Sequence, residues 1–195
     1  LDSATRRNLE LCETLREKQK RGSLLWVLDK TKTAMGARTL RKYVEQPLID
    51  KAEIQRRLDA VEELKTQAIS RDEIREYLSP VYDLERLITK ITYGSANPRD
   101  LIAFRSSLEM LPPIRYILEE MQSELLKNIY QDMDSLADLC DLVQRAIQDE
   151  PPLAMKEVNI IRDGNNEEVD KLRRAKSDGK DWLAKLENDE REKTG

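Results

Sequence analysis

The sequence contains no histidine, and this absence excludes a large block of chemistry. Neither a Ser-His-Asp nor a Cys-His catalytic site can be built, and no imidazole can bind zinc or iron. The 195 residues include only two cysteines, Cys12 and Cys140, which are far apart and form no C-x-x-C pair. We therefore expect no disulfide, and we expect Cys140 to act as a small apolar residue on a helix face.

Glycine and proline are also scarce, with six and seven residues, and aromatic residues make up only 5% of the chain. So few turn residues argue against a β-sandwich or barrel and predict long helices. The aromatic residues are too scattered for a surface that stacks single-stranded bases, so we place Trp26 and Trp182 in the core. The sequence has no apolar run long enough to span a membrane and no signal peptide, which predicts a cytoplasmic protein without a membrane partner.

The charge balance is slightly acidic, with 34 Lys and Arg against 38 Asp and Glu, a net charge of −4. Proteins that bind nucleic acid through their own surface usually carry a basic excess. The basic clusters here are short, as in Arg6-Arg7 and Arg173-Arg174, and acidic neighbours dilute them, so we interpret them as solvated helix faces. We expect the isolated chain to bind DNA poorly.

Capping patterns predict where several helices begin. Asp50 with Glu53 begins one helix, and Ser70 with Glu73 begins the next, which Pro80 ends. The spacing of apolar residues predicts that the first of these helices buries one face, made of Ile54, Leu58, Val61, Leu64 and Ala68.

A stronger helix start lies at Asn97-Pro98-Arg99-Asp100, with an N-cap Asn, a Pro at the first helical position and an Asp near the positive helix end. The apolar stripe that follows continues to residue 125, with a kink or restart at Pro112-Pro113. A further helix is expected from about residue 135 to the Pro151-Pro152 pair.

The last predicted helix begins near Asn166 and covers about 28 residues, which corresponds to about 40 Å. Its apolar residues form a narrow stripe, namely Val169, Leu172, Ala175, Gly179, Trp182 and Leu186. The stripe ends while helix-forming residues continue, which predicts a helix that leaves its core and projects into solvent or toward a partner. Gly179 inside this helix indicates close packing or a weak point.

Strand signals are few. The β-branched run 158–161 ends at the turn dipeptide Asp163-Gly164, and residues 9–11 alternate as an extended segment would. The two segments could pair, but the sequence does not decide this.

At its ends the chain begins at Leu1 without a methionine and closes on the charged run 186–195, and we expect it to be a piece of a longer polypeptide.

No phosphate-binding G-x-x-x-x-G-K-[ST] or G-x-G-x-x-G motif occurs. Ser177-x-x-Lys180 matches the serine-lysine pair of penicillin-binding enzymes, but its partner motifs are missing from the positions they require. We therefore predict no enzyme, with no catalytic, cofactor or metal residues in this chain. Two other classes stay open: a generic helical scaffold or oligomerisation module, and a small hydrolase that uses Ser177 and Lys180.

Several longer strings carry a resemblance to a known family. They include LDSATRRNLEL (1–11), LLWVLDKTKTAMGARTLRKYVEQPL (24–48), NPRDLIAFRSSLEMLP (97–112), IIRDGNNEEVDKLRR (160–174) and WLAKLENDEREKTG (182–195). In this order and over essentially the whole chain, the sequence resembles the core and lever domain (domain III) of the bacterial MutS family of DNA mismatch-repair proteins. The paralogous MutS2 branch shares the character of residues 38–65 and is the alternative.

The resemblance implies a mainly α fold, an irregular multi-helix core with one long projecting lever helix and at most a short β element. It implies a helical core domain at residues 1–165 and a first lever helix at 166–195 that leads toward a clamp domain. In such proteins this segment couples mismatched-DNA binding to an ATPase. The ATP and Mg²⁺ would bind in other domains, and the partners would be those domains, mismatched double-stranded DNA and a second subunit.

The resemblance also nominates residues that support the fold or contact other domains, because they match the family at fixed places. Gly36 is expected to allow close packing early in a helix, Arg38 to anchor an ion pair or inter-domain contact, and Pro47 to end that helix. The full set of candidates is Gly36, Arg38, Pro47, Pro98, Arg99, Asp100, Trp182, Glu187, Glu190 and Arg191. DNA-contacting residues cannot be assigned from the sequence.

Overall fold

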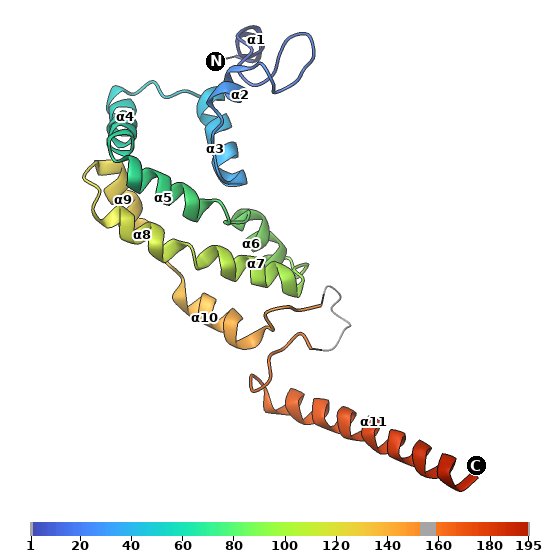
Figure 1. Ribbon diagram of the computed structural model, residues 1–195. Coiled ribbons are helices and arrows are strands. Elements are labelled where there is room, and N and C mark those ends of the chain that lie inside the picture. Colours follow the sequence, from blue (N-terminus) through green and yellow to red (C-terminus); the bar gives the residue numbers. More distant parts are fainter. Residues whose placement is uncertain (1, 153–158, 195) are drawn as a thin grey trace.

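A computed structural model describes residues 2–152 and 159–194, and these residues fold mainly as helices joined by loops (Figure 1). The helices stack side by side from the N-terminal end toward the C-terminal end, and the last helix extends away from the others. The predicted mainly α class is confirmed.

The N-terminal part contains α1 (Ser3–Asn8), α2 (Leu24–Leu28) and α3 (Ala34–Glu45). Each begins with a side-chain cap, and in α3 the Thr33 hydroxyl accepts a hydrogen bond from the Gly36 amide at 3.0 Å. Residues 9–11 are not a strand, because Leu9 caps the end of α1 and Glu10 has a φ of 47°. Their carbonyl groups instead hold the start of α2, since Leu25 donates to the Leu11 carbonyl at 2.8 Å.

The first core cluster lies among α4 (Lys51–Thr66), α5 (Ala68–Leu78), α8 (Leu111–Glu119) and α9 (Glu124–Asp132). Its buried members are Ala60, Ile114, Leu118, Met121 and Leu126. The face predicted for α4 is right at Leu64, which packs against this cluster, and wrong at Leu58 and Val61, which are 54% and 62% exposed. The helix buries the neighbouring face through Ala60, whose small side chain suits close packing between helices.

Two predicted helix boundaries also differ. Ser70 lies inside α5, which begins at Ala68 without a side-chain cap, so the capping box predicted there is wrong. The helix expected to continue through residue 125 ends at Glu119, and α9 starts at Glu124. The turn between them is held by the Glu63 carboxylate of α4, which accepts hydrogen bonds from the amides of Gln122 at 2.6 Å and Ser123 at 2.8 Å.

The second core cluster lies among α6 (Leu84–Thr92), α7 (Pro98–Leu108) and α10 (Ala137–Ala146). Leu87, Phe104 and Leu108 are its buried members. The start of α7 matches the prediction, since the Asn97 side chain accepts from the Asp100 amide and Asp100 accepts from the Asn97 amide, at 2.9 and 3.0 Å. Helix α8 restarts at the Pro112-Pro113 pair, as predicted.

A short β element links the core to the last helix. Ile147 and Ile161 form an isolated antiparallel bridge, flanked by a hydrogen bond from the Arg162 amide to the Ala146 carbonyl at 2.8 Å. Ile147 was predicted to be helical, but α10 ends at Ala146. Ile161 pairs with Ile147 and not with residues 9–11, a pairing that the sequence left undecided. Val158 of that run lies outside the described residues.

Helix α11 (Glu167–Thr194) contains 28 residues, the length that the sequence predicts. Asn166 caps it by accepting hydrogen bonds from the amides of Glu168 and Val169 at 2.9 and 3.1 Å. The middle of the apolar stripe is not packed on the core, because Leu172 and Trp182 are 67% and 62% exposed and nothing lies within 4 Å of a Cβ added at Gly179. Trp26 is also 47% exposed, so the prediction that both tryptophans are core residues is wrong. Among the described residues, no helix is both long and apolar enough to cross a membrane.

Candidate functional site at the base of the long helix

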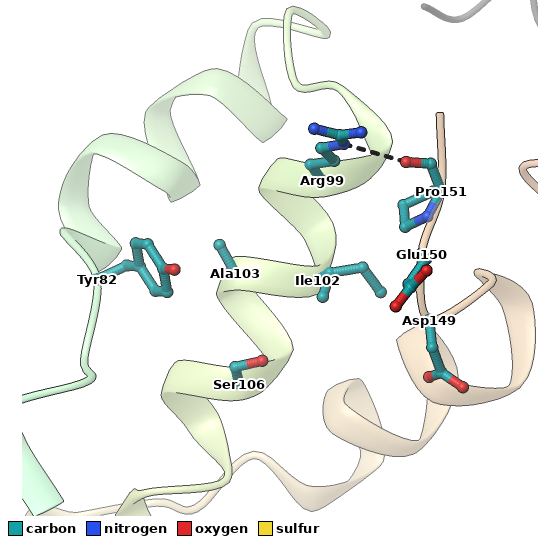
Figure 2. A pocket seen from close by; sticks show the side chains of 8 residues that line it. All are labelled: Tyr82, Arg99, Ile102, Ala103, Ser106, Asp149, Glu150 and Pro151. Carbon is teal, nitrogen blue, oxygen red and sulfur yellow. Dashed lines mark hydrogen bonds between the residues drawn. The ribbon is translucent and has the colours of Figure 1, made fainter. Parts of the chain in front are cut away.

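A cavity lies between α7 and the segment that follows α10 (Figure 2). It has a volume of about 370 Å³ and is lined by Tyr82, Arg99, Ile102, Ala103, Ser106, Asp149, Glu150 and Pro151. Figure 2 shows Arg99 at the start of α7 reaching this segment, where its Nε donates to the Pro151 carbonyl at 3.1 Å. The cavity therefore lies where the chain leaves the end of α10, next to the start of α7.

Asp149, one of the residues that line this cavity, connects two arginines. Its Oδ1 accepts hydrogen bonds from Nη1 of Arg105 in α7 at 3.1 Å and from Nη2 of Arg162 at 2.8 Å. Arg105 first, and then Arg162, hold the pKa of the Asp149 carboxyl below its usual value. The carboxylate is therefore ionised and paired at neutral pH, which suits a structural link and not a general acid.

Arg173 fixes the first turns of α11 to the same segment. Its Nη2 donates to the Ile161 carbonyl at 2.9 Å, and its Nη1 pairs with Asp163. The predicted turn at Asp163-Gly164 is present, with Gly164 at a φ of 83° and its amide donating to Asp170 of α11 at 2.9 Å. We call Arg105, Asp149, Arg162, Asp163 and Arg173 the basal network, because together they tie α7 to the base of α11.

The geometry of the basal network suits a mechanical link. Exposed ion pairs are individually weak, about 0.2–1 kcal/mol, so several are needed to hold one orientation and each can exchange partners. No group of three or more His, Cys, Asp or Glu side chains that could hold a metal ion occurs in the described part of the chain.

The predicted residues of α3 lie in three different local settings. Arg38 forms a bidentate ion pair with Asp83 at 2.7 and 2.8 Å and also pairs with Glu85, so it joins α3 to the start of α6. This contact with Arg38 holds the pKa of the Asp83 carboxyl below its usual value. A Cβ at Gly36 would lie 3.1 Å from the capping Thr33 hydroxyl, and Pro47 follows the last residue of the helix and its cap.

The predicted residues at the start of α7 are split between two contacts. Pro98 is buried at the first helical position. Asp100 forms an ion pair with Lys90 of α6 at 2.8 Å, whereas Arg99 reaches the Pro151 carbonyl. Lys90 first, and then the Asn97 amide, hold the pKa of the Asp100 carboxyl below its usual value.

The predicted residues of α11 are apart from both groups. Trp182 is exposed, and Glu187 and Arg191 form an exposed ion pair at 3.4 Å one turn apart. Glu190 lies in α11, and its side chain is outside the described part. The structure thus does not gather the predicted residues into one site.

Sequence reasoning missed most of the basal network. Arg105, Asp149 and Arg162 are ordinary charged residues in sequence, and only the fold brings them together. Arg173 was interpreted as part of a solvated cluster, yet its side chain is only 27% exposed. The turn dipeptide at Asp163 was the one signal that could have located this junction.

Stacked helices, one projecting helix and a polar junction between them define a mainly α domain. Comparison with known proteins identifies it further, since the family model for MutS domain III matches residues 4–193. The chain belongs to the MutS family and corresponds to its domain III, which confirms the resemblance seen in the sequence.

Curated relatives agree with this assignment. The chain is 64% identical to the DNA mismatch repair protein MutS of Lachnoclostridium phytofermentans over all 195 residues, which cover 21% of that relative. It is 54% identical to MutS of Acetivibrio thermocellus and 56% identical to MutS of Ruminiclostridium cellulolyticum, with full coverage of this chain and 22% of each relative. The chain thus spans about a fifth of the length of the relatives it matches.

Proposed function

We propose that this chain is the core and lever segment of a bacterial DNA mismatch-repair protein. In this proposal it works inside a longer cytoplasmic polypeptide, where it couples binding of mismatched double-stranded DNA to ATP hydrolysis. ATP and Mg²⁺ bind in another domain, and the chain itself is not an enzyme. The observation that carries the proposal is α11, a 28-residue helix that extends from the core and is tied to it at its base.

Coupling requires two arrangements of the same element, each favoured by a different ligand. Leu172 and Trp182 of the apolar stripe of α11 are exposed, so they do not form a packed contact that could distinguish two arrangements within this chain. The basal network is better suited, because its ion pairs connect α7 and α11 to residues 161–163 between them and can be exchanged at small cost. A small tilt of α11 at its base produces a large displacement at its far end, because the helix is about 40 Å long.

The test of this mechanism uses the full-length protein with Arg173→Gln. The affinity for a mismatched duplex is measured with and without a non-hydrolysable ATP analogue, and the ratio of the two affinities is the coupling factor. We expect Arg173→Gln to reduce the coupling factor by about fivefold or more, within the usual range of allosteric coupling, and to change each single affinity less.

Arg174→Gln is the matched control, because Arg174 is the neighbouring arginine, is exposed and forms no ion pair among the described residues. An unchanged coupling factor in Arg173→Gln, or an equal loss in Arg174→Gln, contradicts the assigned role of the basal network.

The outer part of α11 provides a second measurement. Trp182 presents an apolar surface that is 62% exposed, which suits a contact with another domain or with the second subunit. Trp182→Ala should weaken coupling between mismatched DNA and nucleotide more than it weakens the binding of either. Trp26→Ala, which removes another half-exposed tryptophan far from α11 in sequence, is the control and should leave coupling unchanged.

A further inference from the structure

A cavity near the N-terminal end, outside the basal network, gathers arginines from two helices. It has a volume of about 200 Å³, and its walls include Arg6 and Arg7 from the last turn of α1 and Arg41 from α3. Glu13 and Glu45 line the same cavity. We call Arg6, Arg7 and Arg41 the arginine pocket.

Two of the arginines that line this cavity, Arg6 and Arg7, form no ion pair with its carboxylates. Glu45 accepts from Arg41 Nε at 2.9 Å and from the Cys12 thiol at 3.4 Å, so its carboxylate is committed to one side of the cavity. Arg6 and Arg7 form no ion pair with any described residue, and the one side-chain hydrogen bond of Arg6 goes to the Asp2 carbonyl at 3.4 Å. Burial, and then Glu45, raise the pKa of the Cys12 thiol, so Cys12 adds no negative charge at neutral pH. Three guanidinium groups face two carboxylates, and one positive charge is left over.

The number of donors favours one class of ligand. Each guanidinium carries five N–H donors in a fixed fork, and Arg41 uses only Nε toward Glu45. A carboxylate offers two oxygens, which a single arginine satisfies, whereas a phosphate group offers three or more and suits several arginines at once. A negative helix end favours basic residues in the last turn of α1, but it does not explain why Arg41 of another helix faces the same cavity.

We propose that the arginine pocket binds a compact phosphate group, either inorganic phosphate or a phosphate monoester on a small molecule. The cavity lies between α1 and α3 and is bounded by Glu13 and Glu45. Those carboxylates repel the continuous backbone of DNA more than they repel a single phosphate that reaches the arginines.

The test is a titration of the 195-residue chain followed by NMR of the arginine side-chain Nε–H groups. The additions are inorganic phosphate, glycerol phosphate and a short DNA duplex, with sodium chloride at matched ionic strength as the blank. We expect saturable shifts at Arg6, Arg7 and Arg41 with phosphate or glycerol phosphate. The stronger of the two identifies the source of the phosphate.

The variant Arg6→Gln with Arg7→Gln should weaken phosphate binding by about tenfold or more. Its matched control is Arg16→Gln with Arg21→Gln, which removes the same charge from two exposed arginines that do not line the cavity and form no ion pair among the described residues. The dispersion of the backbone spectrum reports whether each variant keeps its fold. The side-chain shifts of the unmodified chain test the proposal without any variant.

Three results overturn the proposal. One is a linear response to phosphate that chloride reproduces, and another is an equal loss of binding in both double variants. The third is a shift of the same arginines by duplex DNA but by neither small phosphate.

Discussion

At the scale of single residues, Ser107 joins α7 to the chain before α6. Its side chain is fully buried, its hydroxyl donates to the Ala103 carbonyl at 2.8 Å, and it accepts from the Tyr82 amide at 3.0 Å. Ser107→Ala leaves the Tyr82 amide without this partner, so we expect a loss of about 1–3 kcal/mol in the free energy of unfolding. Urea unfolding measures it, and Ser106→Ala on the same helix is the control that should cost much less. Equal losses in the two variants would mean that the buried hydrogen bond is unimportant.

The ion pair of Asp100 with Lys90 predicts how the free energy of unfolding depends on pH. Its pKa is below 3.8 in the folded chain, mainly because of Lys90, so its contribution to stability is present above pH 3.8 and is lost as the pH falls through the folded value. Asp100→Asn should therefore lower the free energy of unfolding by about 1–2 kcal/mol at neutral pH and by much less near pH ~2. Unfolding of both proteins in urea at the two pH values tests this. Asp132→Asn, at an exposed residue without a hydrogen bond among the described residues, should cost little at either pH. A cost at Asp100 that is independent of pH would contradict the assignment.

At the scale of elements, α11 is exposed at Leu172 and Trp182, so the stability of its middle depends largely on its own sequence. A Cβ at Gly179 meets nothing within 4 Å, and alanine is favoured over glycine in a helix interior by about 1 kcal/mol. Gly179→Ala should slow amide hydrogen exchange in the middle of α11 by up to about fivefold without unfolding the core. Gly94→Ala is a control of opposite sign, since Gly94 also has open space but a φ of 64°, where alanine is strained. Unchanged exchange at Gly179→Ala would show that the glycine is not the weak point.

At the scale of the whole molecule, the exposed stripe of α11 raises the question of self-association. Residues 172, 175, 179, 182 and 186 follow the 3-4 spacing of a coiled-coil seam, which favours an oligomerisation module as the second candidate function. We expect a connecting segment to sediment as a monomer at all concentrations. Sedimentation velocity with and without residues 186–195 tests this. A dimer that disappears on truncation would favour the oligomerisation module.

Local sequence signals predicted the parts of the fold whose energetics are local. The Asn97–Asp100 capping box, the restart at Pro112-Pro113 and the 28 residues of α11 depend on neighbouring residues only, and the structure has them as predicted. The Ser70–Glu73 box has the residue types of a capping box, but α5 begins three residues earlier, with Gln67 as its N-cap, because packing against α4 and α8 outweighs one cap.

The buried face of a helix was less predictable than its start. On α4 the larger apolar residues Leu58 and Val61 predicted the wrong face, because burial depends on which side α5 and α9 approach. The candidate residues divide in the same way. Arg38 and Asp100 were named from the sequence, but their partners Asp83 and Lys90 follow from the packing of α6.

The sequence by itself determined that this chain is mainly helical, that it belongs to the MutS family and that its last helix is long and highly charged. Composition, helix caps and family-matching sequence strings depend only on the chain itself or on neighbouring residues, so they can be recognised without knowing the fold. Tertiary structure decided the contacts between distant residues: Glu63 capping α9, Asp149 between Arg105 and Arg162, and Arg6 and Arg7 beside Arg41. Such contacts depend on the relative positions of whole helices, so no local pattern of charge in the sequence predicts them.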